Sequence, residues 1–219
     1  MKPGKQCPQG SCDYDKPPRR NRDLENIIEK SDFGLKCSKT GCNVELTREK
    51  LAKHELKCEF RMVPCPYTGC SKRIIVRDLK TCLESHKPMR IDNAAGIMKH
   101  GFALSEDILA SKLIDWFPVL CTDPNGLEFY HQFLKRNGLW YCWVKVKTDP
   151  EAAAKFNFSV KVENVKTGFK MEFCGQVHPI DDSVEEIMAS GNFLLMQTEN
   201  IKKVINRDKV EILFSVVPK

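Results

Sequence analysis

Apolar and polar residues alternate with a period of two through much of residues 91–219, which is typical of half-buried strands. In the segment 155–162, Phe156, Phe158, Val160 and Val162 are apolar and the residues between them are polar. Similar runs occupy 127–133, 139–147, 168–173 and 210–217. Turn-forming residues separate the runs, at 123–126, 136–138, 149–150 and 164–168. The pattern therefore predicts six or so short strands.

One helix is expected to interrupt these strands. The segment 183–190 has a helical composition, Asp181 or Asp182 can cap its N-terminus, and Gly191 follows where a left-handed C-terminal residue would lie. Many short strands with a single helix favour an antiparallel β-sandwich.

The region before residue 90 has few apolar residues and contains a repeat of chemistry-bearing residues instead. Cys37, Cys42, His54 and Cys58 form a first set, and adding 28 to each number gives Cys65, Cys70, Cys82 and His86. Each position falls on a metal-ligand type, with only the order of the last two types exchanged. The fold class predicted from both regions is mostly β, with small α+β zinc fingers preceding the sandwich.

Four thiolate or imidazole ligands at the corners of a tetrahedron are the set that structural zinc prefers. Gly41 and Gly69 each precede the second cysteine of a pair and permit a tight turn. The segment 47–57 reads as a capped helix that presents His54 and Cys58, since residues four apart share one helix face. We therefore expect two zinc ions with no position open for a substrate. The alternative is a set of reduced cysteines in a small core, but each unit has too few apolar residues to fold without a metal.

Cysteine usage and charge refine this picture. Eight of the eleven cysteines lie within residues 1–82, no secretory leader is visible and no apolar run is long enough to cross a membrane. Clustered cysteines in that context indicate a reducing compartment and metal binding, so we expect a cytoplasmic location, with the nucleus as a further compartment. Residues 1–90 carry 20 Lys and Arg against 12 Asp and Glu, whereas residues 91–219 carry 15 against 17. Two modules with different roles are indicated.

The remaining cysteines and histidines point to no enzyme site. Cys121, Cys142 and Cys174 have no nearby catalytic partner in the sequence and are expected to be core or edge residues. Cys7 and Cys12 either form half of another zinc site or belong to a disordered tail.

Together these features resemble the seven-in-absentia (SIAH-type) family of E3 ubiquitin ligases, within the wider group of TRAF-like proteins. The segment 53–66, KHELKCEFRMVPCP, is similar to that family's link between fingers. Residues 20–29 resemble the helix after a RING domain, Ile114-Asp115-Trp116 resembles the start of the substrate-binding sandwich, and 178–196 resembles its helix-plus-strand segment.

The resemblance implies three parts: a RING remnant and connecting helix at 1–31, tandem zinc fingers at 32–90, and a TRAF-like substrate-binding sandwich at 91–219. Family members dock a ubiquitin-charged conjugating enzyme (E2) through the RING, dimerise through the sandwich and capture protein substrates there. On this basis Cys7 and Cys12 would be the last RING ligand pair, but three residues separate Pro8 from Cys12 where the family has one. The paired finger cysteines are also closer together than is usual in the family, and Cys82 and His86 are in reversed order. We expect E2 recruitment only if a RING precedes this chain, and hence no ligase activity from the chain on its own.

The resemblance also implies a partner-binding site, since extended degron peptides add along an edge of the family's sandwich. It assigns Asp115, Trp116, Phe117 and Val119 to partner contact. Pro118 suits an edge strand because it cannot donate to a ladder. The alternative is that Trp116 and Phe117 are plain core residues.

Three functions compete at this point. The first is the substrate-recognition part of a ubiquitin ligase in protein degradation, and the second is a TRAF-like adaptor without ligase activity. The third, nucleic-acid binding, is suggested by the basic half and the tandem fingers. It is disfavoured because Glu49 and Glu55 make the first predicted finger helix mixed in sign. No membrane partner is expected.

Overall fold

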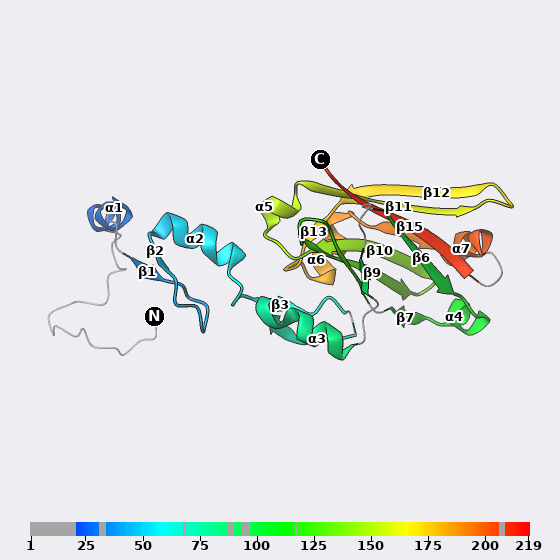
Figure 1. Ribbon diagram of the computed structural model, residues 1–219, viewed down its shortest axis with the longest axis horizontal. Coiled ribbons are helices and arrows are strands. Elements are labelled where there is room, and N and C mark those ends of the chain that lie inside the picture. The colour runs from blue at the N-terminus through cyan, green and yellow to red at the C-terminus, as the bar shows by residue number, and fades with distance from the viewer. Residues whose placement is uncertain are drawn as a thin grey trace, which may run out of the picture.

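The computed structural model describes residues 21–30, 34–67, 69–86, 90–92, 97–116, 118–205 and 209–219. A helix and two small Cys/His units precede a larger body of two β-sheets, and Figure 1 shows these parts following one another along the long axis of the molecule. The N-terminal elements are α1 (Arg22–Lys30), β1 (Leu35–Lys36), β2 (Glu45–Leu46), α2 (Arg48–Lys57), β3 (Met62–Pro64), β4 (Arg73–Ile75), the 3-10 turn η1 (Val76–Asp78) and α3 (Leu79–Ser85).

Two sheets make up the C-terminal body. The larger sheet contains β5 (Arg90–Asp92), β7 (Leu113–Asp115), β8 (Val119–Thr122), β9 (Glu128–Arg136), β10 (Leu139–Val146), β13 (His178–Pro179) and β14 (Leu194–Gln197). The smaller contains β6 (Ile97–Ala103), β11 (Phe156–Asn164), β12 (Phe169–Gln176) and β15 (Lys209–Pro218). The helices of this region are α4 (Glu106–Ala110), α5 (Pro150–Ala153), α6 (Val184–Ser190) and α7 (Thr198–Val204).

The larger sheet has the central order β13-β10-β9-β8-β5, with β14 also paired to β10 and β7 to β9. The smaller has the order β12-β11-β15-β6 and is antiparallel throughout. The expectation of a purely antiparallel fold is wrong for the larger sheet, since β5 pairs with β8 and β13 pairs with β10 in parallel. Parallel neighbours need a crossover connection, and the segments between these strands supply it. Alternation within one strand does not reveal the direction of its partner.

The core of this body lies between the two sheets. Alternate residues of the predicted runs meet there, including Phe129 and Phe133 from β9, Val144 from β10, Phe158 from β11 and Phe214 from β15. The Phe133 and Phe214 rings meet edge to face with their centroids 5.3 Å apart. The period-two pattern identified the buried face of β11 correctly, but the expectation of half-buried strands is wrong for β9 and β10, which are buried along both faces.

The expected helix is present as α6, but its N-terminal cap was predicted wrongly. Ser183, and neither Asp181 nor Asp182, is the capping residue: its Oγ accepts a hydrogen bond from the Glu186 amide, and the Glu186 carboxylate accepts one from the Ser183 amide. Gly191 ends the helix in the left-handed region at φ 71°. The single-helix expectation is also wrong, because this region contains α4, α5 and α7 as well.

Candidate metal centres

The first cluster joins four side chains from the β1–β2 hairpin and α2. One candidate ligand atom from each of Cys37, Cys42, His54 and Cys58 lies within 4.8 Å of all the others. The Sγ atoms of Cys37 and Cys58 are 3.8 Å apart, and Cys42 Sγ is 3.4 Å from His54 Nε2. We call residues 34–58, which hold this cluster, the first finger.

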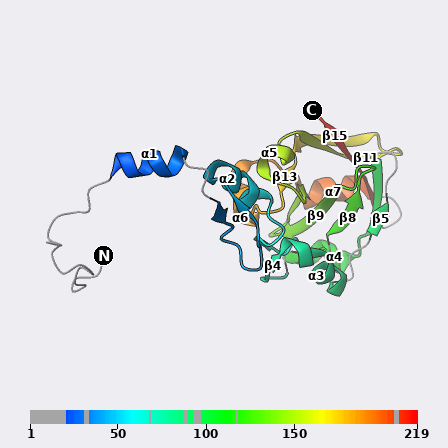
Figure 2. The same ribbon diagram turned by 60° about the vertical axis from the view of Figure 1, so that its left-hand side comes forward.

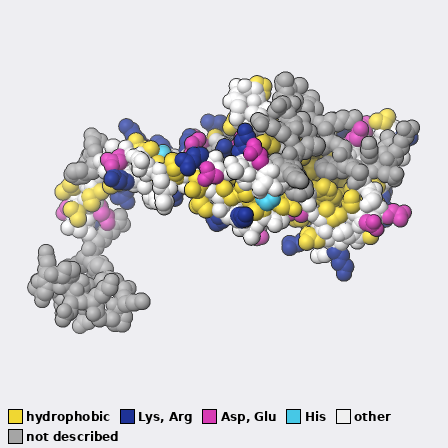
Figure 3. Space-filling model, turned by 60° about the horizontal axis from the view of Figure 1, so that its bottom comes forward, with side chains coloured by type: hydrophobic (Ala, Val, Ile, Leu, Met, Phe, Trp, Pro, Cys, Tyr) yellow, Lys and Arg dark blue, Asp and Glu magenta, His cyan; other side chains and the backbone are white. Residues whose placement is uncertain are grey.

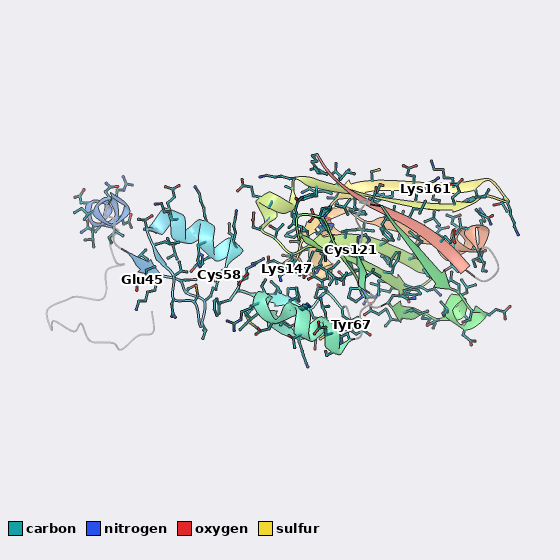
Figure 4. The ribbon with its side chains drawn as sticks, in the orientation of Figure 1. Glu45, Cys58, Tyr67, Cys121, Lys147 and Lys161 are labelled. Carbon is teal, nitrogen blue, oxygen red and sulfur yellow. The ribbon has the colours of Figure 1, made fainter. Side chains whose placement is uncertain are left out.

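The second cluster repeats this arrangement in residues 62–86, the second finger. Cys65, Cys70, Cys82 and His86 again bring one ligand atom each within 4.8 Å of the others. Cys82 Sγ lies 3.9 Å from Cys65 Sγ and 3.7 Å from His86 Nε2. Figure 4 labels Cys58 in the first finger, below α2, and Tyr67 in the second.

The backbone of the two knuckles obeys the same 28-residue repeat as the side chains. In the first, the Cys37 amide donates to the Val44 carbonyl and the Cys42 amide to the Lys39 carbonyl. In the second, Cys65 donates to Lys72 and Cys70 to Tyr67, with N···O distances of 3.0 and 2.9 Å. The sequence repeat is therefore a repeat of the hydrogen-bonded turn that brings the cysteines together.

The two knuckle glycines act differently. Gly41 adopts φ 89°, as expected for a tight turn, and a Cβ there would lie 3.0 Å from the Phe60 ring. Gly69 lies in the corresponding turn but does not adopt a positive φ, so that turn does not need glycine for its backbone conformation. A Cβ at Gly69 would instead approach the Tyr67 ring to 2.9 Å.

These donor sets fit a tetrahedral metal ion. With zinc–sulfur bonds of about 2.3 Å and zinc–nitrogen bonds of about 2.0–2.1 Å, the edges of a tetrahedron measure about 3.8 Å between two sulfurs and about 3.5 Å from sulfur to nitrogen. The observed separations of 3.8 and 3.9 Å, and of 3.4 and 3.7 Å, lie close to those values. Each cluster can hold a metal ion, consistently with zinc, and three thiolates with one imidazole are a usual structural zinc set.

Without a bound cation, burial disfavours the charged thiolate form of two of these cysteines. It raises the pKa of Cys58 to about 11 and that of Cys65 to about 12. The pKa of Cys42 is lowered instead, first by the hydrogen bond from the Val44 backbone. A bound dication would supply the positive charge that buried thiolates need.

The sequence did not reveal the residues around the ligands. The Tyr67 ring lies 4.8 Å from the His86 ring, centroid to centroid, and Glu55 accepts a hydrogen bond from the Ser38 amide beside Cys37. Arg61, between the fingers, is only 7% exposed and donates from Nη1 to the Cys58 carbonyl. Neither tyrosine nor arginine is a metal-ligand type, so nothing in the ligand pattern marked Tyr67 or Arg61.

The residues assigned to partner contact do not form one surface: some lie at or next to the edge strand β7, and one lies in the core between the sheets. Asp115 ends β7, which pairs with the 134–136 end of β9, and it is half-buried. The half-buried Trp116 stacks on Trp140 with the centroids 5.1 Å apart. Val119 is 3% exposed within β8, between β9 and β5, so it contributes to the core and not to a contact surface. Phe117 lies outside the described residues.

In the described part of the chain, the outer edge of β7 carries no paired strand. Leu113, at the start of that strand, is 60% exposed. Pro118 lies between β7 and β8, where the pairing along β9 passes from one strand to the next.

The surface of the fingers is mixed in charge. Figure 3 shows Lys and Arg side chains interspersed with acidic and apolar ones. Lys53 pairs with Glu49 on α2 and Lys36 with Glu45 on the hairpin.

Comparison with known proteins gives a likeness over part of the chain. No protein-family model matches the chain. A TNF receptor-associated factor family protein of Dictyostelium discoideum is 41% identical to it over 56 residues, which are 24% of this chain. The match spans only 11% of that relative's length. Together with the Cys/His clusters, this likeness fits a TRAF-like zinc-binding protein.

No helix in the described residues has the length and apolar character needed to traverse a lipid bilayer.

Proposed function

We propose that this chain is the zinc-binding, substrate-recognition part of a seven-in-absentia-type E3 ubiquitin-protein ligase. The observation that carries the proposal is the pair of Cys/His clusters, each with four ligand atoms within 4.8 Å. Two structural zinc ions, held by Cys37, Cys42, His54 and Cys58 and by Cys65, Cys70, Cys82 and His86, would stabilise the fingers. Zinc binding can contribute about 10–16 kcal/mol to the folding of such units.

Substrate capture is assigned to the C-terminal body. The outer edge of β7 can accept an extended peptide strand, and the exposed Leu113 lies at that edge. Asp115 and Trp116 follow in the chain and would set the side-chain preference. A ligase of this type does no covalent chemistry through these residues, and its contribution is to hold a substrate near a charged E2.

A TRAF-like adaptor without ligase activity is the second candidate. It is favoured by the match to a TNF receptor-associated factor family protein. Both candidates predict metal and peptide binding, and they differ only in ubiquitin transfer. A discharge assay on the full gene product with a ubiquitin-charged E2 would separate them, because only the ligase accelerates discharge.

The test of the shared part combines metal analysis with peptide selection. Purified chain should contain about two equivalents of zinc, and a displayed peptide library should yield extended binders. The Leu113→Glu variant should weaken those binders at least about tenfold by placing a charge at the β7 edge. Val165→Glu is the matched control, since Val165 is 86% exposed in the turn between β11 and β12. Zinc well below two equivalents would contradict the metal assignment, and equal affinities in both variants would contradict the β7 assignment.

A further inference from the structure

The two fingers differ in what covers their candidate metal sites. No residue of α2 is buried, and in the first finger only Cys37 and Cys58 are, at 8% and 2% exposed. The first finger therefore has almost no core apart from its four ligands. Figure 2 shows α2 of this finger between α1 and the sheets.

The second finger shares its core with the larger sheet. A single apolar cluster contains residues of the finger and of the C-terminal body, all at most 5% exposed: Val63, Cys65, Val76, Leu79, Leu83, Leu120, Tyr130 and Ile180. Two further candidate ligands, Cys70 and Cys82, pack against this cluster. The site is thus part of the interface that covers Leu120 of β8 and Tyr130 of β9.

A buried polar contact fixes the segment between the two fingers to the C-terminal body. Arg61 Nε lies 3.1 and 3.2 Å from the two carboxylate oxygens of Asp181, and the Arg61 side chain is 9% exposed. The first finger reaches the sheets through Lys57, whose Nζ is 3.3 Å from Asp149 and whose side chain is 63% exposed. The Asp149 side chain is only 4% exposed, but the Lys57 ammonium stays largely in water and no apolar cluster accompanies this contact, so the first finger is less firmly attached than the second.

From this asymmetry we propose that metal in the second site latches the second finger over the outer face of the larger sheet. Loss of that metal releases the finger and uncovers an apolar surface made by Leu120, Tyr130 and Ile180. Loss of metal from the first site leaves this surface covered. The inference rests on the proposed zinc binding and adds that only the second site is thermodynamically linked to the sandwich.

The test compares Cys42→Ser with Cys70→Ser, which remove corresponding ligands of the two sites. All three tryptophans lie in the C-terminal body, at Trp116, Trp140 and Trp143, so tryptophan fluorescence reports its unfolding alone. We expect Cys70→Ser to lower the thermal midpoint by on the order of 10 °C and to bind a hydrophobic dye. Cys42→Ser should keep the midpoint within about 2 °C of the unaltered chain. Equal midpoints in the two variants would overturn the proposal.

A second measurement covers the case in which Cys70→Ser fails to fold. The unaltered chain is treated with increasing chelator, and amide hydrogen exchange is followed by mass spectrometry. Peptides spanning 119–131 should lose their protection from exchange when zinc leaves the second site. Unchanged protection at that point would contradict the latch. Metal content separates the two failures: about two zinc ions with no linkage refutes the latch alone, and no zinc refutes the proposed metal binding itself.

Discussion

At the scale of single residues, Gly41 offers a direct test of the first knuckle. Alanine at φ 89° is strained by about 1–2 kcal/mol, and its Cβ would also meet the Phe60 ring at 3.0 Å. Because an apo finger must fold when it binds metal, we expect Gly41→Ala to weaken zinc binding at the first site about 5- to 30-fold. Competition against a zinc chelator measures this.

Gly34→Ala is the control for that experiment. Its Cβ would lie 3.6 Å from Glu45 in ordinary contact, and Gly34 does not adopt a positive φ. Its zinc affinity should match that of the unaltered chain, and an unchanged affinity in Gly41→Ala as well would show that the knuckle tolerates a side chain.

The same residues show which features of the metal sites could be predicted from the sequence. The repeat placed all eight candidate ligands in two clusters, because ligand type and spacing are written directly in the chain. It could not distinguish Gly41 from Gly69, since one avoids strain and the other avoids the Tyr67 ring. Backbone dihedrals and ring positions depend on the folded surroundings.

At the scale of elements, the cap of α6 can be tested by mutation. Ser183→Ala removes the acceptor for the Glu186 amide, 3.2 Å away, and should lower the free energy of unfolding by about 1 kcal/mol. Gln197→Ala at the start of α7 is the control, because Gln197 is exposed and makes no side-chain cap bond. It should change stability by less than about 0.5 kcal/mol. Urea unfolding followed by tryptophan fluorescence compares the two, and similar losses would mean that the capping box does not stabilise α6.

The elements also mark the limit of prediction from pattern. Long alternating strands such as β11 were found with the correct buried face, because burial imposes the period on the sequence. The parallel pairings of β13 and β5 were missed, since each spans only two or three residue pairs and their partners are far away in the chain. The Ser183 cap was missed because three residues able to cap a helix stand next to one another at 181–183.

At the scale of the whole molecule, the division into a basic N-terminal half and a near-neutral C-terminal half suggested two separate modules. The structure instead packs the second finger on the larger sheet through one shared apolar cluster. Val63, Val76, Leu79 and Leu83 looked too few to form a core, and by themselves they are. Of their partners, only Tyr130 lies in an alternating run, on the face of β9 opposite the core between the sheets, whereas Leu120 and Ile180 lie outside the predicted runs.

Removing the contact between Arg61 and Asp181 tests how much this attachment contributes to the free energy of unfolding. Asp181→Ala leaves the guanidinium buried without its carboxylate, which costs about 3–5 kcal/mol for a fully buried pair. Because the Asp181 side chain is 35% exposed, we expect a smaller loss of about 1–3 kcal/mol in the free energy of unfolding. Urea unfolding followed by tryptophan fluorescence measures it.

Asp78→Ala is the matched control, since Asp78 pairs with Arg77 at 3.5 Å with both side chains more than half exposed. That pair should contribute less than about 0.5 kcal/mol and lose even this in high salt, whereas the effect of Asp181→Ala should survive screening. If the two variants were equally stable, Arg61 would not fix the second finger to the sheets. If they differ as expected, the segment between the two metal sites is itself anchored to the sandwich, and the first finger is then the part free to reorient.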